Sequence, residues 1–389
     1  MQYDVIIVGA GPAGLATGYF TLLFSNNMKL NLSVIMIDKD HVPGKNKPCG
    51  GMICYPALKL FPELRYLGDR IIAGIGIVYR SKNYDIMFNE PIAVNMDRAK
   101  LAKFILEKFS SLGGNFLGGV IVKKIKIHEH GVEILSNKGT IQGKVLVGAD
   151  GFNSLVRSQL FQTQIKWDML GVAYQESISL SENIIDDMFD NHNLFYYGRE
   201  FSPAGYAWIF PHRDHVRVGV GAIASRVVGQ NLERYMRRLK KLNGIADKKI
   251  LKKEGYIVPL SGGLKKLVTN RCLLVGDSAH QVSPLSGAGI HYSMLAGLLA
   301  GKILVQSVLK NDFSEKALKK YEALWNRMFR FKLKLERFLV DLLLSKRFKI
   351  KKNRTFNYEQ LRVFAEVLVG KKDSKDLLIS YIMNKIRKF

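Results

Sequence analysis

The glycine-rich run GAGPAG (9–14) constrains the fold of this chain more than any other feature of its sequence. It follows the apolar run YDVIIV (3–8), which is typical of a buried parallel strand, and it opens a segment that predicts a helix over 12–24. A second strand is expected over 32–37, where LSVIMI is followed by Asp38. A strand, a glycine loop, a helix and a second strand predict a βαβ unit.

The glycines of this loop have the spacing of a dinucleotide-binding turn. Gly9 permits the tight turn, Gly11 lets the backbone approach a pyrophosphate, and Gly14 allows close packing of the helix on the strand. Asp38 stands where a carboxylate binds ribose hydroxyls. The pattern therefore predicts a dinucleotide site, and it leaves NAD and FAD equally open.

The rest of the chain alternates between helix and strand patterns. In chain order these are a helix over 97–111, strands over 120–127, 131–136 and 144–150, strand-like segments through 167–260, a strand over 271–277, a helix from about 287, and amphipathic helices over the last 80 residues. The middle segments predict a separate antiparallel sheet. We expect an α/β fold whose domains are interleaved rather than strung in series.

Cysteine usage and hydropathy indicate where the protein works. Three cysteines in 389 residues are too few for a disulfide framework, and the first residues lack the basic region of a signal peptide. A reducing, cytoplasmic compartment is expected. Cys49 and Cys54 lack the CxxC spacing, so no metal site is expected. The most apolar segment, 295–309, is short and contains Lys302, and the chain is not expected to cross a membrane.

The net charge of +26 is unevenly spread. Between Lys302 and the end, 23 Lys and Arg residues face 9 Asp and Glu residues, and the basic run KRFKIKKNR (346–354) follows the apolar run FLVDLLLS (338–345). This combination suits an anionic membrane surface or an anionic lipid. An ordinary solvated helical face is the alternative. No nucleic-acid partner is expected, because no recognition motif accompanies the charge.

Two further motifs, GADGFNSLVR (148–157) and GDSAHQVSPLSGAGI (276–290), each overlap or follow an expected strand. With the first motif, they resemble the FAD-dependent oxidoreductases of the para-hydroxybenzoate hydroxylase type. That resemblance implies FAD, with Asp277 on the ribityl hydroxyls and the amides of 287–290 near the flavin and its phosphates. The alternative is three glycine turns in an unrelated α/β fold.

The segment NMDRAKLAKFILEKF (95–109) resembles the family's helix whose arginine faces the cofactor, and this implies that role for Arg98. An ordinary solvated helix charge is the alternative. Val122 falls where the family touches the adenine through its backbone.

A narrower resemblance rests on PCGG (48–51) and YAWIFP (206–211). These motifs look like the geranylgeranyl reductase branch, whose members saturate isoprenoid double bonds in archaeal membrane lipids or in the chlorophyll side chain. The resemblance covers about residues 1–310. Strand alternation puts Tyr206, Trp208 and Phe210 on one face, where they line an apolar tunnel or simply form sheet core. The chain departs from the branch at His280, where glycine is more usual, and at Asp38, where glutamate is usual.

The resemblance implies the following site residues. The catalytic residues are Cys49, Tyr206 and Trp208. The substrate-binding residues are Gly51, Tyr206, Trp208 and Phe210. The cofactor-binding residues are Gly9, Gly11, Ala13, Gly14, Asp38, Cys49, Gly50, Arg98, Val122, Asp277, Gly287, Gly289 and Ile290.

The expected architecture is a Rossmann-like FAD-binding domain interleaved with an antiparallel β-sheet substrate domain, followed by a helical region. The expected boundaries are 1–75, 95–165 and 266–310 for the FAD-binding domain, 76–94 and 166–265 for the substrate domain, and 311–389 for the basic C-terminal helical region.

The preferred hypothesis is reduction of prenyl carbon–carbon double bonds, with hydride from reduced FAD. An unactivated alkene has no carbonyl to delocalise developing charge, so protonation and hydride delivery must be closely coupled in a dry pocket. Cys49 then either donates the proton or shapes the pocket. The alternatives are a monooxygenase or halogenase of the same fold, to which His280 points, and an electron-transfer flavoprotein. NADPH, NADH or reduced ferredoxin is the expected electron donor.

Overall fold

The computed structural model describes residues 2–45, 47–79, 82–163, 165–229, 231–344, 357–377 and 379–380. Within them the chain forms two compact units. The first unit takes the residues up to 47, 98–165 and 259–334, and the second takes 48–97, 166–258 and the described residues from 335 onward. The expected interleaving is confirmed, because the chain enters each unit three times.

The first unit is built on a sheet in the order β17-β18-β11-β1-β2-β8, with β10 and β9 added beside β11. Its strands are β1 (Gln2–Val8), β2 (Val34–Asp38), β8 (Asn115–Gly118), β9 (Val122–Ile127), β10 (Val132–Ser136), β11 (Gly139–Gly148), β17 (Val268–Thr269) and β18 (Cys272–Leu274). β18, β11, β1, β2 and β8 run parallel to one another. Their carboxyl ends therefore meet at one edge of the sheet, where ligands bind in open α/β folds.

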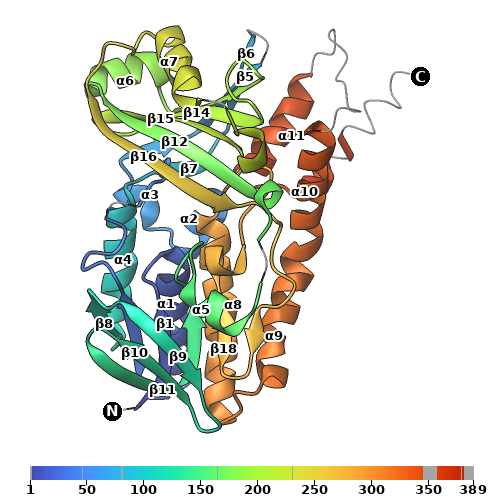
Figure 1. Ribbon diagram of the computed structural model, residues 1–389. Helices are drawn as coiled ribbons and strands as arrows, with labels where there is room; N and C mark the ends of the chain where they lie inside the picture. Colours follow the sequence, from blue (N-terminus) through green and yellow to red (C-terminus); the bar gives the residue numbers. More distant parts are fainter. Residues whose placement is uncertain are drawn as a thin grey trace. The chain divides into compact units, whose positions relative to one another are not determined.

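The helices of the first unit, labelled in Figure 1, are α1 (Pro12–Asn27), α4 (Arg98–Ser111), α5 (Leu155–Leu160), α8 (Ile290–Leu309) and α9 (Glu315–Trp325). α1 and α8 lie side by side and run in the same direction. A Cβ atom at Gly297 would lie 2.7 Å from the amide nitrogen of Thr17, and one at Gly301 would lie 2.8 Å from the amide nitrogen of Thr21. Because each pair lies four residues beyond the last, the N-termini of the two helices lie close together.

α8 is the one helix of the described chain that is long and apolar enough to cross a membrane by length and composition. Of its most apolar window, 67% is buried inside the protein, where it packs against α1. Burial of this kind is typical of a core helix in a globular domain.

The second unit is built on a sheet in the order β16-β12-β15-β14-β13-β5-β6. Strands β13 and β5 pair in parallel, and the pairs β12–β15, β15–β14, β14–β13 and β5–β6 are antiparallel. Its strands are β5 (Gly74–Tyr79), β6 (Lys82–Met87), β12 (Leu170–Ser179), β13 (His192–Tyr197), β14 (Gly205–Pro211), β15 (His215–Ile223) and β16 (Ile250–Pro259). A small sheet joins β3 (Met52–Cys54), β7 (Ala93–Asn95) and β4 (Arg70–Ile72). The expected antiparallel sheet is thus confirmed, with one parallel pair within it.

The remaining helices of the described chain are α2 (Tyr55–Leu60), α3 (Leu64–Leu67), α6 (Glu182–Phe189), α7 (Leu232–Leu242), α10 (Phe331–Leu344) and α11 (Tyr358–Leu368). Each face of the large sheet buries a different cluster. Ala207 and Ile209 pack with side chains of α6 and α7 on one face, whereas Trp208 and Phe210 pack with side chains of α11 on the other. The predicted alternation along β14 is therefore confirmed.

The compact units depart from the expected domain boundaries most at residues 48–75 and 311–334, and by a few residues at 95–97 and 259–265. Residues 48–75 lie in the second unit, because β3 and β4 both pair with β7. Residues 311–334 lie in the first unit, where α9 packs on α8, and those from 335 onward lie in the second. The basic run at 346–354 lies outside the described residues.

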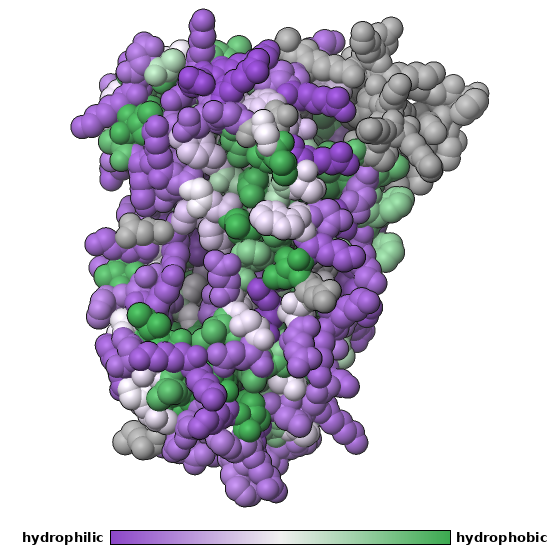
Figure 2. Space-filling model, viewed as in Figure 1, coloured by the Kyte–Doolittle hydropathy of each residue, from purple (hydrophilic) through white to green (hydrophobic). Residues whose placement is uncertain are grey.

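The strand expected over 271–277 is shorter than predicted, because residues Gly276–Ala279 form a 3₁₀ turn after β18. Hydrophilic side chains cover most of the face drawn in Figure 2, and apolar side chains appear there in smaller groups.

Candidate functional site

The three glycines of the loop in the first unit differ in their surroundings. Gly9 and Gly14 have no room for a side chain, whereas the backbone at Gly11 is uncovered. Gly9 has a φ of 106°, and a Cβ there would overlap the carbonyl oxygen of Ala149. A Cβ at Gly14 would overlap the carbonyl oxygen of Gly9. Gly11 differs, because nothing in the described chain lies within 4 Å of its Cβ position. The backbone at Gly11 is therefore not covered by a neighbouring residue of the described chain, and its predicted approach to a pyrophosphate stays a prediction.

Asp38, at the end of β2, braces this loop. Its Oδ2 accepts a hydrogen bond of 2.6 Å from the amide of Ala10, and its Oδ1 accepts one of 2.8 Å from the amide of Asp40. The amide of Val120 donates to the Asp38 carbonyl at 2.8 Å, which brings the segment before Val122 to the same edge of the sheet. Asp38 is half-buried.

Two helix N-termini meet at this edge. No side chain of the described residues caps α1 or α8, so their first amides can bind an anion. Ala13, in the first turn of α1, would lie 2.6 Å from a Cβ at Gly276. Before α8, the chain turns at Gly287, whose φ is 68°, and the Asp277 carboxylate lies 3.3 Å from the Cβ position of Gly289. Ile290 is the first residue of α8.

These features fit a dinucleotide such as FAD. Open backbone at Gly11 and two uncapped helix N-termini suit the pyrophosphate, and the carboxylates of Asp38 and Asp277 suit sugar or ribityl hydroxyls. Arg98 begins α4, and its carbonyl oxygen lies against Gly44. The predicted role of the Arg98 guanidinium toward a cofactor stays a prediction.

The motif GADGFNSLVR has an internal structural role. Arg157 is buried, and its guanidinium donates to the carbonyls of Ser278 (3.2 Å) and Phe152 (2.6 Å). The Ser278 hydroxyl donates to the carbonyl of Gly148 at 2.7 Å, and the Asp150 carboxylate accepts from Ser154 at 2.5 Å. Burial raises the pKa of Asp150. The motif thus ties the end of β11 to the turn after β18.

His280 is a buried residue of the same region. Its backbone is left-handed, with a φ of 55°, and its Nδ1 lies 2.9 Å from the Ser261 hydroxyl. Its Nε2 is buried and has no hydrogen-bond partner within the described chain. Burial, with a smaller contribution from Arg157, lowers the pKa of His280 to about 3. The imidazole is therefore neutral at physiological pH.

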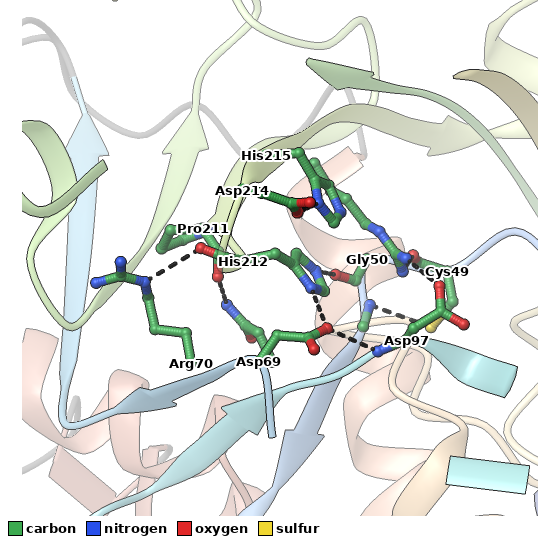
Figure 3. A network of polar contacts seen from close by, with 12 residues as sticks. Cys49, Gly50, Asp69, Arg70, Asp97, Pro211, His212, Asp214 and His215 are labelled. Atoms are coloured by element: carbon green, nitrogen blue, oxygen red, sulfur yellow. Dashed lines mark hydrogen bonds and ion pairs between the residues drawn. The ribbon is translucent and has the colours of Figure 1, made fainter. Parts of the chain in front are cut away.

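The loop Cys49–Gly51 lies in the second unit, and each of its three carbonyl oxygens accepts a hydrogen bond. Figure 3 shows Cys49 and Gly50 with their polar neighbours. The Cys49 carbonyl accepts from Arg217 Nη1 at 2.6 Å and from Gln175 Nε2 at 3.2 Å. The Gly51 carbonyl accepts from the amide of Met96 at 2.9 Å. The Cys49 sulfur accepts from the Gly51 amide at 3.4 Å. The loop is thus held by elements that are distant in sequence.

The Gly50 carbonyl lies 3.1 Å from Nε2 of His212, whose Nδ1 lies 3.1 Å from Asp69 Oδ2. The same Asp69 oxygen accepts from the amide of Asp97 at 3.2 Å. Asp97 in turn forms an ion pair with Arg217, in which Oδ2 and Nη2 lie 2.8 Å apart. Figure 3 shows His212, Asp69 and Asp97 close to Gly50 and Cys49.

Both glycines of the loop are required by neighbouring rings. A Cβ at Gly50 would lie 2.7 Å from the Phe210 ring and 3.4 Å from Trp208 Nε1. Gly51 has a φ of 89°, and a Cβ there would lie 2.7 Å from Cε1 of His212. The PCGG loop and the aromatic strand β14 are therefore packed against each other.

The predicted aromatic residues lie on one face of β14, where Trp208 and Phe210 are buried and Tyr206 is half-buried. Trp208 is 8% exposed and Phe210 is 7% exposed. The indole nitrogen of Trp208 and the hydroxyl of Tyr197 are buried without a hydrogen-bond partner in the described chain. Burial raises the pKa of Tyr206 well above its usual value, and the nearby thiols of Cys54 and Cys49 add to this. Tyr206 is therefore a neutral phenol close to Cys49.

Sequence reasoning missed the residues that hold this loop, namely Gln175, Arg217, His212, Asp69 and Asp97. One signal was available: Arg217 is the only charged residue within the apolar run VRVGVGAIA (216–224). A charge in a buried strand is retained when it has a buried partner. His212 directly follows the aromatic motif, but adjacency alone does not indicate a contact with residue 50.

The described residues contain no group of three or more His, Cys, Asp or Glu side chains that could hold a metal ion. Cys49, Cys54 and Cys272 form no disulfide.

Comparison with known proteins places this geometry among flavoproteins. The family model described as "FAD binding domain" matches residues 128–328. The chain is 30% identical over 348 residues to the digeranylgeranylglycerophospholipid reductase of Methanocella arvoryzae, covering 83% of this chain and 82% of the relative. It is 29% identical over 342 residues to digeranylgeranylglycerophospholipid reductase 1 of Methanococcoides burtonii, covering 84% and 80%.

Among solved structures, a geranylgeranyl bacteriochlorophyll reductase-like protein of Thermoplasma acidophilum superposes with a TM-score of 0.79. Its sequence identity is 20%, and the match covers 95% of this chain and 91% of that protein. At this identity the likeness concerns the fold.

Proposed function

The chain belongs to the digeranylgeranylglycerophospholipid reductase family within the FAD-binding-domain proteins, and from this premise we propose that it reduces isoprenoid carbon–carbon double bonds. The substrates are the geranylgeranyl chains of archaeal-type membrane lipids or of their precursors. The observation that carries the proposal is the packing of the PCGG loop on the aromatic strand, in which Phe210 and Trp208 leave room for no side chain at Gly50.

Reduced FAD, when bound, supplies the hydride for such a reduction. The residues proposed to hold it in the first unit are Gly9, Gly11, Ala13, Gly14, Asp38, Arg98, Val122, Asp277, Gly287, Gly289 and Ile290. In the second unit, Cys49 and Gly50 are proposed to contact it. The fit of the glycine loop, the two helix N-termini and the two carboxylates to a dinucleotide supports this set.

Cys49 is proposed to donate the proton. Addition of hydride to one alkene carbon leaves the neighbouring carbon needing a proton, and a positioned thiol supplies it. The resulting thiolate would accept a hydrogen bond from the Gly51 amide, whose nitrogen lies 3.4 Å from the sulfur. The anchored carbonyls of the loop limit how far the thiol can move, and solvent returns the proton after turnover.

Tyr206, Trp208 and Phe210, with Gly51, are proposed to contact the prenyl chain. Their common apolar face suits a hydrocarbon. Tyr206 stays protonated because burial raises its pKa, so it can orient the thiol or the substrate but is not a base. NADPH, NADH or reduced ferredoxin is proposed to supply the two electrons.

Contact with an anionic membrane surface is proposed to occur through α10 and the π-helical segment Asn326–Arg330 that precedes it. Phe331 and Phe338 are 71% and 60% exposed. Exposed Arg327 and Lys334 stand at helical spacing from them, so the four form one stripe, and Arg330 is exposed beside it. Exposed aromatic rings flanked by cations suit the lipid headgroup boundary, and a lipid substrate has to be reached there. We call these residues the Phe331 stripe.

The proposal is tested by anaerobic incubation of the reduced holoenzyme with an unsaturated archaeal-type phospholipid and, separately, with geranylgeranyl diphosphate. Mass spectrometry should show a gain of two hydrogens for each bond reduced. A monooxygenase or halogenase, the second candidate, would give no such gain and would instead consume oxygen. An electron-transfer flavoprotein would change neither lipid.

A further inference from the structure

His212 and Asp69 have a hydrogen-bond arrangement that fixes where protons lie. A backbone carbonyl can only accept, so the 3.1 Å contact between Nε2 and the Gly50 oxygen requires a hydrogen on Nε2. On the other side, Nδ1 faces Asp69 Oδ2 at 3.1 Å. Two lone pairs cannot face each other at this distance, so one further proton lies between Nδ1 and Asp69.

This proton is shut away from solvent. The side chain of His212 is 0% exposed and that of Asp69 is 9% exposed. Burial lowers the pKa of His212, the hydrogen bond to Asp69 opposes that effect, and Arg217 and His215 lower it further. Whichever partner holds the proton, Nε2 keeps its own hydrogen and stays a donor.

We infer that Asp69 and His212 act as a positioning pair, in which Asp69 locks His212 in the state whose Nε2–H holds the Gly50 carbonyl and so sets the place of the Cys49 thiol. The inference rests on the proposed function, because it assigns the thiol's position a purpose. The His212 ring thus contacts two residues of the loop. Its Nε2 bonds the Gly50 carbonyl, and its Cε1 lies against Gly51.

The neighbouring pair of His215 and Asp214 provides a matched control. The His215 ring stacks on His212 with centroids 4.5 Å apart, and its Nδ1 lies 2.7 Å from Asp214. The Asp214 side chain is 84% exposed, however. It is not one of the groups that contact the Cys49–Gly51 loop, and a solvated pair of this kind contributes little.

The proton assignment is tested by nitrogen NMR of the histidine-labelled holoenzyme, with H212Q used to assign the signal. Nε2 of His212 should carry a slowly exchanging hydrogen throughout the range from about pH 6 to about pH 9, where an ordinary histidine loses its charge. An unprotonated Nε2 would overturn the inference. This measurement needs no substrate, so it can succeed even if the proposed function fails.

The positioning role is tested by D69L, D69N and D214L. D69L should lower kcat for alkene reduction about tenfold, as expected for one lost buried hydrogen bond, with KM and FAD content unchanged. D69N should restore most of kcat, because its amide can donate to Nδ1 and leave Nε2–H on Gly50. D214L should match the wild type. Unchanged kcat in a folded D69L, or loss in D69N equal to that in D69L, would overturn the inference.

Discussion

The indole ring of Trp208 lies against the backbone of Gly219, its partner in the register between β14 and β15. A Cβ at Gly219 would overlap the ring, whereas one at Gly221 would lie 3.4 Å from the same indole, an ordinary contact. The absence of a side chain at Gly219 therefore lets the Trp208 ring pack directly on the backbone of β15. Its position matters because Nε1 of this ring faces Gly50 of the PCGG loop.

Replacing Gly219 with alanine should destabilise the second unit and displace Trp208. Overpacking of a buried ring costs about 1–3 kcal/mol, so the free energy of unfolding in urea should fall by that amount. G221A, on the same strand and beside the same ring, should cost much less. Equal effects of the two substitutions would contradict the contact between Trp208 and Gly219.

Replacing Cys49 with alanine should leave FAD bound and abolish alkene reduction. The backbone carbonyls that anchor the loop remain, so the loop should keep its place while the proton donor is lost. C54A, which removes the buried thiol five residues along, is the matched control and should keep most activity. The readouts are flavin content and saturated lipid product. Turnover of C49A at the wild-type rate would mean that the sulfur only shapes the pocket.

The first βαβ unit could be predicted from the sequence because its signals are local. Gly9, Gly14 and Asp38 act within a single turn and the strand that follows it. The close packing expected at Gly9 and Gly14 is observed, whereas the role of Asp38 toward a ribose stays a prediction. The alternation of Tyr206, Trp208 and Phe210 is equally local, since it depends on the period of one strand.

The anchoring of the PCGG loop could not be predicted in the same way. It joins Cys49 to Arg217 and Gly50 to His212, pairs separated by more than 160 residues. Such contacts depend on how β14 and β15 stack beside the loop, and no spacing in the sequence encodes that. The domain boundary at 75 failed for the same reason, because the pairing of β3 with β7 is a tertiary contact.

The free energy of unfolding should fall as the pH falls below about 6.5, because buried histidines stay neutral in the folded protein. The pKa of His280 is about 3 in the folded protein, below its usual value near 6.5, so the unfolded chain binds more protons between these values. The contribution is complete above about pH 6.5 and is lost as pH falls toward 3, at about 1.4 kcal/mol per pH unit. Burial lowers the pKa of His291 to about 3 as well.

H280N tests this dependence, because asparagine tolerates the left-handed backbone at that position. Urea unfolding of the holoenzyme at pH 6 and pH 5 should show a smaller loss for the variant, by about 1.4 kcal/mol. An identical pH dependence in wild type and variant would show that His280 is not held neutral.

The Phe331 stripe should bind anionic vesicles. Replacing Phe331 and Phe338 with serine should weaken co-sedimentation with vesicles containing phosphatidylglycerol. Each substitution removes the apolar area of one ring that would otherwise enter the membrane interface. Y66S is the control, since Tyr66 is 88% exposed but lies away from α10 in the sequence. Binding of the double variant equal to wild type would remove this surface from the account.

The most direct test of the central claim is a single-turnover measurement without oxygen. The flavin of the holoenzyme is first reduced chemically, an unsaturated archaeal-type phospholipid is added, and flavin absorbance is followed while the lipid is analysed by mass. One flavin should be oxidised for each carbon–carbon double bond saturated, and C49A should show neither change. A flavin that stays reduced in the presence of lipid, and is oxidised only when oxygen is admitted, would contradict it.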